Sequence, residues 1–211
     1  ALGELNLPTQ VVASEFLTME GKKFSSSKGV VIYVRDVLSR YQPDALRYFI
    51  SIAGPETSDS DFTWAEFVRR NNSELVAAWG NLVNRTATMV AKNFGEIPAA
   101  VELEDVDREI LDAVRGGFET VGDAIAHHRQ RAALAEIMRL VGEANAYVTR
   151  TEPFKLKAPE VRDRLATVLN TLIQVVSDLN TMMSVFLPHS SNAIDVVLGG
   201  AGNLAPMPSL V

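Results

Sequence analysis

Seven consecutive residues, from Lys23 to Gly29, bring together the groups that proteins use to bind phosphate: Lys-Phe-Ser-Ser-Ser-Lys-Gly. The lysines supply positive charge, the serine hydroxyls and backbone N–H groups supply hydrogen-bond donors, and the glycine allows close approach. The composition therefore suits a loop that binds phosphate oxygens. Taken alone, however, these residues favour a solvated loop between two strands, because loops rich in lysine and serine are common.

The residues around this loop predict a mixed α/β region at 1–63. Short runs of β-branched and aromatic residues predict strands at 11–12, 16–17 and 30–34. A helix should begin near Val34, and because Pro43 interrupts its pattern, one helix and two short helices are equally compatible with the sequence. Residues 52–60 are predicted to form a loop.

From Phe62 onward the apolar residues recur with a helical period. The predicted helices span about 64–94, 106–126, 129–150, 160–186 and 190–198. Helices of this length with short connections predict an antiparallel bundle over 64–198. Residues 199–211 are rich in glycine and proline and are predicted to form a C-terminal tail. The predicted fold class is therefore mainly α, with an α/β region followed by a helical bundle.

The chain carries 26 acidic and 20 basic residues, a formal net charge of −6. This balance counts against a simple nucleic-acid-binding domain, which normally has a basic excess. The acidity is local, however, because residues 95–123 hold nine acids and two bases and leave 17 acids and 18 bases elsewhere. Charge alone therefore does not exclude a polyanionic partner. The predicted helix at 64–94 has four basic residues against two acidic ones.

The sequence contains no cysteine, which excludes disulfides and thiolate-bound metal and fits a reducing compartment. His127 and His128 are adjacent, and neighbouring side chains on a helix point about 100° apart, so we predict no metal site in this chain. Polar residues interrupt the apolar stretch at 168–187, which predicts a buried helix and not a membrane span. The chain begins at Ala1 with neither an initiator methionine nor a signal pattern, so we expect it to be part of a longer protein.

Two short sequence elements, one before the loop and one after it, help to interpret the loop. Residues 14–21 read Ser-Glu-Phe-Leu-Thr-Met-Glu-Gly before it, and Asp44-Ala45-Leu46-Arg47 follows on the predicted helix. This arrangement resembles class I aminoacyl-tRNA synthetases, with their KMSKS loop, the strand that passes the adenine of ATP, and an Asp-x-Leu-Arg helix. The resemblance implies that residues 1–63 are the end of a Rossmann-like catalytic domain with its stem-contact region.

Three further segments narrow the resemblance to methionyl-tRNA synthetases of bacterial type. They are Asp61-Phe62-Thr63-Trp64 through Glu74-Leu75, Trp79 through Thr86, and Asn145-Ala146-Tyr147-Val148 with Glu152-Pro153-Phe154. Their order covers most of the chain. The chain therefore looks like the C-terminal part of such an enzyme, from just before the KMSKS loop through a helical anticodon-binding domain at 64–198.

The resemblance implies anticodon contacts for Asn81, Arg85 and Phe154. Asn81 and Arg85 are four residues apart and share one helix face, and their amide and guanidinium groups suit the Watson–Crick edges of exposed bases. Phe154 stands where the family usually has a tryptophan that stacks on a base, and a phenyl ring retains that stacking face. From the residues alone, an interhelical hydrogen bond or salt bridge for Asn81 and Arg85, and a core position for Phe154, are open alternatives. We expect Trp79 to pack in the core.

The resemblance implies ATP contacts for Leu17 and for the loop residues Lys23, Phe24, Ser25, Ser26, Ser27 and Lys28. It also implies catalytic roles for Lys23, Ser26 and Lys28, because the family uses this loop to stabilise pyrophosphate as it leaves. The sequence departs from the family at Ser26, which stands where the second lysine is usual. Our hypothesis is that Lys28 partly replaces the missing ammonium group while Ser26 donates a hydrogen bond.

The implied reaction is the ATP-dependent activation of L-methionine and its transfer to tRNA(Met), with Mg²⁺ accompanying ATP. The family's first half of the ATP site, its methionine pocket and its zinc-carrying insertion are not found in these residues, so we expect the chain alone to be inactive. We expect a cytoplasmic monomer without membrane contact, and a solvated acidic face at 95–123 turned away from the tRNA. The alternatives are a cysteinyl or leucyl synthetase and a non-catalytic tRNA-binding module.

Overall fold

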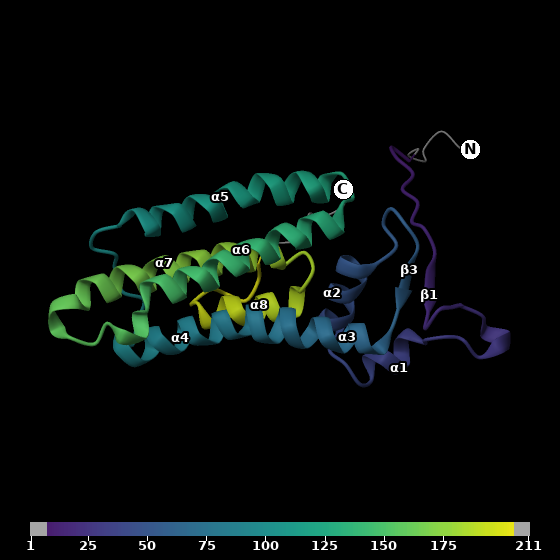
Figure 1. Cartoon of the computed structure of the whole chain (residues 1–211), viewed down its shortest axis with the longest axis horizontal. Coiled ribbons are helices and arrows are strands. Elements are labelled where there is room, and N and C mark those ends of the chain that lie inside the picture. Colours follow the sequence, from purple (N-terminus) through teal and green to yellow (C-terminus); the bar gives the residue numbers. More distant parts are fainter. Residues whose placement is uncertain (1–7, 205–211) are drawn as a thin grey trace.

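The structure is a computed structural model that describes residues 8–204, apart from the side chain of Ser26. Figure 1 shows an elongated molecule in which long helices lie side by side and a small sheet stands at one end. The predicted fold class is confirmed, because an α/β region comes first and a helical bundle follows it. Within the described residues, no helix combines the length and apolar character needed to cross a membrane.

The sheet has three short strands in the order β2-β1-β3. Strand β1 (Leu17–Met19) pairs antiparallel with β2 (Lys22–Lys23) and parallel with β3 (Ser60–Phe62). The turn between β1 and β2 consists of Glu20 and Gly21, whose φ angles are 50° and 73°. Two residues with positive φ make the kind of tight turn that matches the twist of a hairpin.

Asp61 fixes the register of this hairpin. Its carboxylate accepts hydrogen bonds from Thr18 Oγ1 at 2.6 Å and from the Gly21 backbone N–H at 3.0 and 3.1 Å. Thr18 in turn lies opposite Lys23 on β2. The pairing therefore sets where the chain leaves the sheet and enters the loop that begins at Lys23.

Two of the predicted strands are wrong. Val11 and Val12 are 85% and 56% exposed and belong to no strand, and Val30 makes only an isolated bridge with Ser25. A run of β-branched residues forms a strand only where a neighbouring strand supplies hydrogen bonds. The described part of the chain offers no such partner to these segments.

Pro43 divides the next helical segment, so the two-helix alternative is the one observed. Helix α1 spans Val34–Leu38 and helix α2 spans Pro43–Ala53, with Pro43 in the first turn of α2, where its missing N–H is not needed. Phe49 of α2 packs edge-on against Phe62 of β3, with ring centroids 5.1 Å apart. This contact ties α2 to the sheet.

The predicted helix at 64–94 is present, but its middle part is not α-helical. Helix α3 (Trp64–Arg70) continues into a π-helical segment, η2 (Asn71–Gly80), and then into α4 (Asn81–Asn93). Thr63 caps the start by accepting a hydrogen bond from the Glu66 N–H at 3.2 Å. π-Helical segments are rare and are often found at functional sites.

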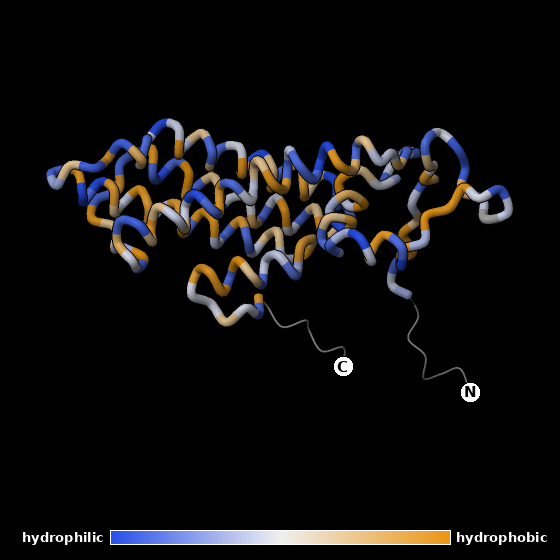
Figure 2. The backbone as a smooth tube through the Cα atoms, turned by 90° about the horizontal axis from the view of Figure 1, so that it is seen from below, coloured by the Kyte–Doolittle hydropathy of each residue, from blue (hydrophilic) through white to orange (hydrophobic). Residues whose placement is uncertain are grey.

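The bundle is completed by four helices and two short 3₁₀ turns. They are α5 (Asp105–Ala126), α6 (Gln130–Thr151), η3 (Pro153–Lys155), η4 (Pro159–Val161), α7 (Arg162–Met183) and α8 (Pro188–Val197). Figure 2 shows hydrophobic and hydrophilic residues alternating along these helices, as expected of helices that each bury one face. Helix α8 begins two residues earlier than predicted, because proline is favoured in a first turn.

A buried polar network joins α5, α6 and α7. The Asp107 side chain is fully buried and accepts hydrogen bonds from the Tyr147 hydroxyl at 2.5 Å and from both terminal nitrogens of Arg164, one of them at 3.0 Å. Arg164 also pairs with Glu104 at 3.1 Å. Asp107 is therefore an exception to the solvated acidic face expected at 95–123.

Asp107 should make stability depend on pH. Burial raises the pKa of Asp107, but hydrogen bonds from Arg164, Tyr147 and the Glu104 N–H outweigh burial, so the pKa lies below its ordinary value. Such a group contributes stability above the unfolded-state pKa of about 3.9, and this is lost as the pH falls through the lower folded-state pKa. In urea titrations, the free energy of unfolding should fall more steeply below about pH 4 in the wild type than in Asp107→Asn. Parallel pH profiles would contradict this assignment.

Candidate phosphate loop and nucleic-acid interface

The segment that begins at Lys23 leads from β2 into a small closed loop at residues 25–30. Ser25 and Val30 exchange backbone hydrogen bonds of 2.8 and 3.0 Å across its neck, and the Lys28 N–H donates to the Ser25 carbonyl at 3.2 Å. A single 3₁₀ turn, η1 (Ser26–Lys28), forms its tip. Gly29 has a φ of 69°, a conformation that favours glycine. The glycine is therefore needed to close the loop.

Exposed cations flank the loop. Lys23 and Lys28 are both exposed, and within residues 8–204 neither forms an ion pair. Phe24 is 39% exposed, Ser27 is exposed, and Ser25 is half-buried. The structure thus brings these predicted residues together in one loop. An exposed backbone with unpaired ammonium groups is chemically suited to phosphate.

Leu17 lies beside the loop and not in it. It is half-buried in β1, next to Thr18, which pairs with Lys23. The backbone of Ser26 begins the 3₁₀ turn, and its side chain lies outside the described part of the structure.

Asn81 and Arg85 lie one turn apart at the start of α4. Leu82, Val83 and Thr86 are buried and fix which face of the helix packs against the bundle. Asn81 is exposed and Arg85 is half-buried, and neither side chain hydrogen-bonds to another described residue. The alternative of an interhelical hydrogen bond or salt bridge is therefore not observed, and both polar groups are free for an external partner.

Phe154 projects from the connection between α6 and α7. Helix α6 ends at Thr151. The next residue, Glu152, has a left-handed conformation with a φ of 43°, and buried Pro153 then starts η3. The Phe154 side chain is 48% exposed, so the core alternative is wrong for this residue. Trp79, by contrast, is 3% exposed and packs in the core as predicted. An exposed aromatic face can stack on a base.

Contacts between the end of α4 and the start of α7 hold the α6–α7 connection close to the end of α4. The Arg162 guanidinium lies 4.6 Å from the centroid of the Phe94 ring and donates to the Asn93 carbonyl at 3.2 Å. In Figure 1, α4 runs toward the end of the bundle that carries the green α6–α7 connection, whereas the purple loop lies at the opposite end of the molecule. The loop therefore lies apart from α4 and from the α6–α7 connection.

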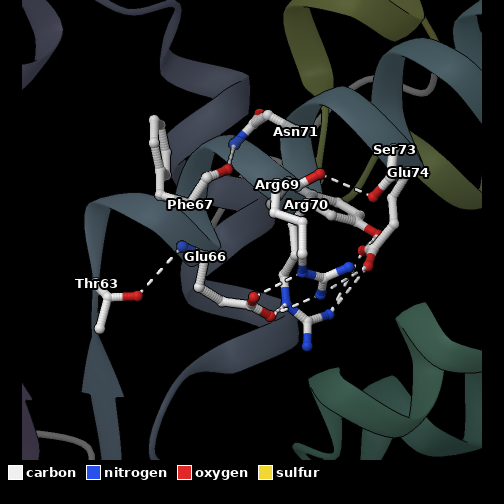
Figure 3. Close-up of polar contacts among 9 residues, drawn as sticks. Thr63, Glu66, Phe67, Arg69, Arg70, Asn71, Ser73 and Glu74 are labelled. Atoms are coloured by element: carbon white, nitrogen blue, oxygen red, sulfur yellow. Dashed lines mark hydrogen bonds and ion pairs between the residues drawn. The ribbon is translucent and has the colours of Figure 1, made fainter.

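The structure corrects the charge argument for residues 64–94. Arg69 and Arg70 each hydrogen-bond to Glu66 at 2.7 Å, and Arg70 also contacts Glu74 at 3.2 Å (Figure 3). Hydrogen bonds from Arg69 and Arg70 lower the pKa of Glu66 to about 2. These two arginines are neutralised locally, so Arg85 and Lys92 carry the available positive charge. Their three- and four-residue spacing from the glutamates is the sequence signal that predicts such pairs.

The two adjacent histidines face different partners. His127 Nδ1 lies 2.8 Å from the Asp123 carbonyl, whereas His128 Nε2 lies 3.4 Å from Gln10 Oε1. The described residues contain no group of three or more His, Cys, Asp or Glu side chains arranged to hold a metal ion.

A family model described as "tRNA synthetases class I (M)" matches residues 1–87. The methionine–tRNA ligases of a Nocardioides species and of Kineococcus radiotolerans are each 64% identical over 208 residues, which is 99% of this chain. The chain is homologous to methionine–tRNA ligases. It spans about a third of their length, 35% and 34% respectively.

The solved structures agree with this homology. Mycobacterium tuberculosis methionyl-tRNA synthetase in complex with methionyl-adenylate superposes with a TM-score of 0.88 at 29% sequence identity. The match covers 93% of this chain and 40% of that one. The fold thus corresponds to a class I remnant followed by a helical domain. These relatives and this solved structure are named as methionyl enzymes, not as cysteinyl or leucyl synthetases.

Proposed function

We propose that this chain is the C-terminal part of a bacterial-type methionine–tRNA ligase, from just before the KMSKS loop through the anticodon-binding domain. The observation that carries the proposal is 64% identity to such ligases over 99% of the chain. The complete ligase joins L-methionine to AMP with release of pyrophosphate from ATP, and then transfers methionine to the terminal ribose of tRNA(Met). This chain supplies the loop and the anticodon reader.

We propose a division into three parts, with α2 at the boundary of the first two, because its Tyr48 and Ile52 lie in the main core of the bundle. Residues 1–63 form the end of the catalytic domain with the stem-contact region, 64–198 form the anticodon-binding domain, and 199–211 form the tail. Phe49 and Phe62 belong to a small aromatic cluster beside the sheet, separate from the main core of the bundle. Phe67 of α3 joins that cluster, so the first turns of the long helix anchor one domain to the other.

The loop acts on the departing pyrophosphate. In this proposal, the ammonium groups of Lys23 and Lys28 and a hydrogen bond donated by Ser26 stabilise the negative charge that increases as the bond to the α-phosphate breaks. Because that charge develops mainly in the transition state, these groups raise the rate more than they tighten ground-state binding. Leu17, Phe24, Ser25 and Ser27 complete the contacts with ATP. The closed, cation-flanked loop supports this assignment.

The bundle reads the anticodon through Asn81, Arg85 and Phe154. The amide and guanidinium groups hydrogen-bond to base edges, and the phenyl ring stacks on a base. The support is that all three side chains are at least partly exposed and that the fold does not use the polar groups of Asn81 and Arg85.

The remaining partners follow from the proposed reaction. ATP brings Mg²⁺ through its phosphate oxygens, while methionine, the rest of the ATP site and any zinc ion are bound by parts of the ligase outside this chain. We propose that the ligase is a cytoplasmic monomer.

Replacing Lys28 tests the loop. In the complete ligase, Lys28→Ala should slow ATP–pyrophosphate exchange at least tenfold, about 1.4 kcal/mol of transition-state stabilisation. Lys22→Ala is the matched control, because Lys22 is equally exposed on β2 outside the loop. An exchange rate of Lys28→Ala within about twofold of the wild type, roughly 0.4 kcal/mol, would exclude a catalytic role for Lys28. The isolated chain should show no exchange, and clear turnover would contradict the proposed division of the ATP site.

A further inference from the structure

Helix α2 is held at its N-terminal end by the junction between α7 and α8. Asp44 is 4% exposed, and its Oδ2 accepts a hydrogen bond from the Ser190 N–H at 2.6 Å, in the first turn of α8. One turn along α2, Arg47 donates from Nε to the Phe186 carbonyl at 3.1 Å and from Nη2 to the Val185 carbonyl at 2.9 Å. Two side chains from one turn of α2 thus bind both sides of this junction.

The C-terminal end of α2 is held by the start of α6. Arg131 donates from Nη2 to the carbonyl of Gly54, the residue after α2, at 2.6 Å. Glu56 accepts a hydrogen bond from the Arg131 backbone N–H at 2.9 Å. The side chains of Glu56 and Arg131 are half-buried, so these bonds are partly shielded from water.

The charged side chains at both ends of α2 have the sign that is favoured at the helix termini they contact. The carboxylates of Asp44 and Glu56 lie at the N-terminal turns of α8 and α6, where unpaired N–H groups and the helix dipole favour negative charge. Arg47 meets carbonyl oxygens just beyond the C-terminal end of α7, where positive charge is favoured. Five hydrogen bonds among eight residues, from elements far apart in the sequence, therefore define one orientation of α2 on the bundle.

Helix α2, together with the first turns of α3, connects the bundle to the sheet that carries the loop. In Figure 1 it lies between the sheet and the bundle. Phe49 packs on Phe62 of β3, and β3 pairs with β1, which in turn pairs with the loop-bearing strand β2. The orientation of α2 on the bundle therefore sets the orientation of the loop relative to the anticodon reader.

We propose that Asp44, Arg47 and Arg131 are positioning residues that hold the loop-bearing sheet and the anticodon-reading bundle at the separation required by one tRNA. This inference rests on the proposed function. A tRNA bound through its anticodon presents its acceptor end at high effective concentration only if the two parts keep a fixed geometry. Removing the contacts that fix α2 on the bundle lowers this effective concentration without altering the loop or the anticodon reader.

The test uses the complete ligase with Asp44→Ala, Arg47→Ala or Arg131→Ala. For each variant, ATP–pyrophosphate exchange and kcat/KM for charging are measured with tRNA(Met) carrying the CAU anticodon and with the same tRNA carrying an altered anticodon. We expect at least a tenfold fall in kcat/KM for the CAU tRNA, with exchange and charging of the altered tRNA within twofold of the wild type. Arg139→Ala is the control, because Arg139 is exposed and, among the described residues, pairs only with Glu136 and Glu143 of its own helix.

The outcomes separate the inference from the proposed function. The inference is overturned if charging of the CAU tRNA stays within twofold, or if exchange and charging of both tRNAs fall together, as general damage would cause. Arg47→Lys keeps the cation but not the two-carbonyl fork, and gives the same readout if Arg47→Ala does not fold. If the wild-type ligase itself fails to distinguish the two tRNAs, the anticodon-reading proposal fails instead.

Discussion

Replacing Arg164 with alanine should lower the free energy of unfolding by about 3 kcal/mol, the low end of the range for breaking a buried ion pair. The substitution leaves the Asp107 carboxylate buried with only Tyr147 and the Glu104 N–H as partners. Asp107 is fully buried, whereas the Arg164 side chain is 20% exposed, which is why the low end applies. Urea unfolding monitored by circular dichroism measures the loss.

The control for this prediction is Arg115→Ala. Arg115 pairs with Asp112 at 3.3 Å, but both side chains are more than 70% exposed, so the expected loss is about 0–1 kcal/mol. Tyr147→Phe, which removes one hydrogen bond to Asp107, should lie between the two variants. If Arg164→Ala lost no more stability than Arg115→Ala, the network would not hold α5, α6 and α7 together.

The second large effect is expected at Arg85. Arg85→Ala should weaken binding of tRNA(Met) with the CAU anticodon by about 1.5–3 kcal/mol, the value of hydrogen bonds to a charged group, or about 10- to 150-fold. Binding of a tRNA with an altered anticodon should change far less, because its bases do not pair with this guanidinium. Equilibrium binding of both tRNAs at matched salt gives the comparison.

Lys92→Ala provides the matched control, because Lys92 is an exposed cation on the same helix. A lysine that contacts only phosphates affects both tRNAs alike and reduces the salt dependence of binding. Were Arg85→Ala to weaken both tRNAs equally, Arg85 would be a phosphate contact and not a base reader.

Much of the bundle could be predicted from the sequence. Each helix buries one face, so its apolar residues recur with a clear helical period. The connection at 152–161 could also be predicted, because Pro153 and Pro159 interrupt the helical pattern of apolar residues. The exposure of Phe154 was not predictable. It depends on burial of Pro153 and on the left-handed conformation of Glu152, which are set by tertiary packing.

The first region was harder to predict, because its stability comes from contacts distant in sequence. Val11 and Val12 resemble a strand locally but have no strand partner among the described residues. Asp44 and Arg47 were recognisable as part of a family element, yet their partners near residues 185–190 could not be read from local pattern. The π-helical segment at Asn71–Gly80 likewise leaves the apolar period of residues 64–94 nearly unchanged.

We propose that this chain recognises an anticodon through Asn81, Arg85 and Phe154. The most direct measurement is the dissociation constant of the chain for tRNA(Met) with its CAU anticodon and for the same tRNA with an altered anticodon, at one salt concentration. We expect at least tenfold tighter binding of the CAU form, about 1.4 kcal/mol. Equal dissociation constants for the two tRNAs would contradict it.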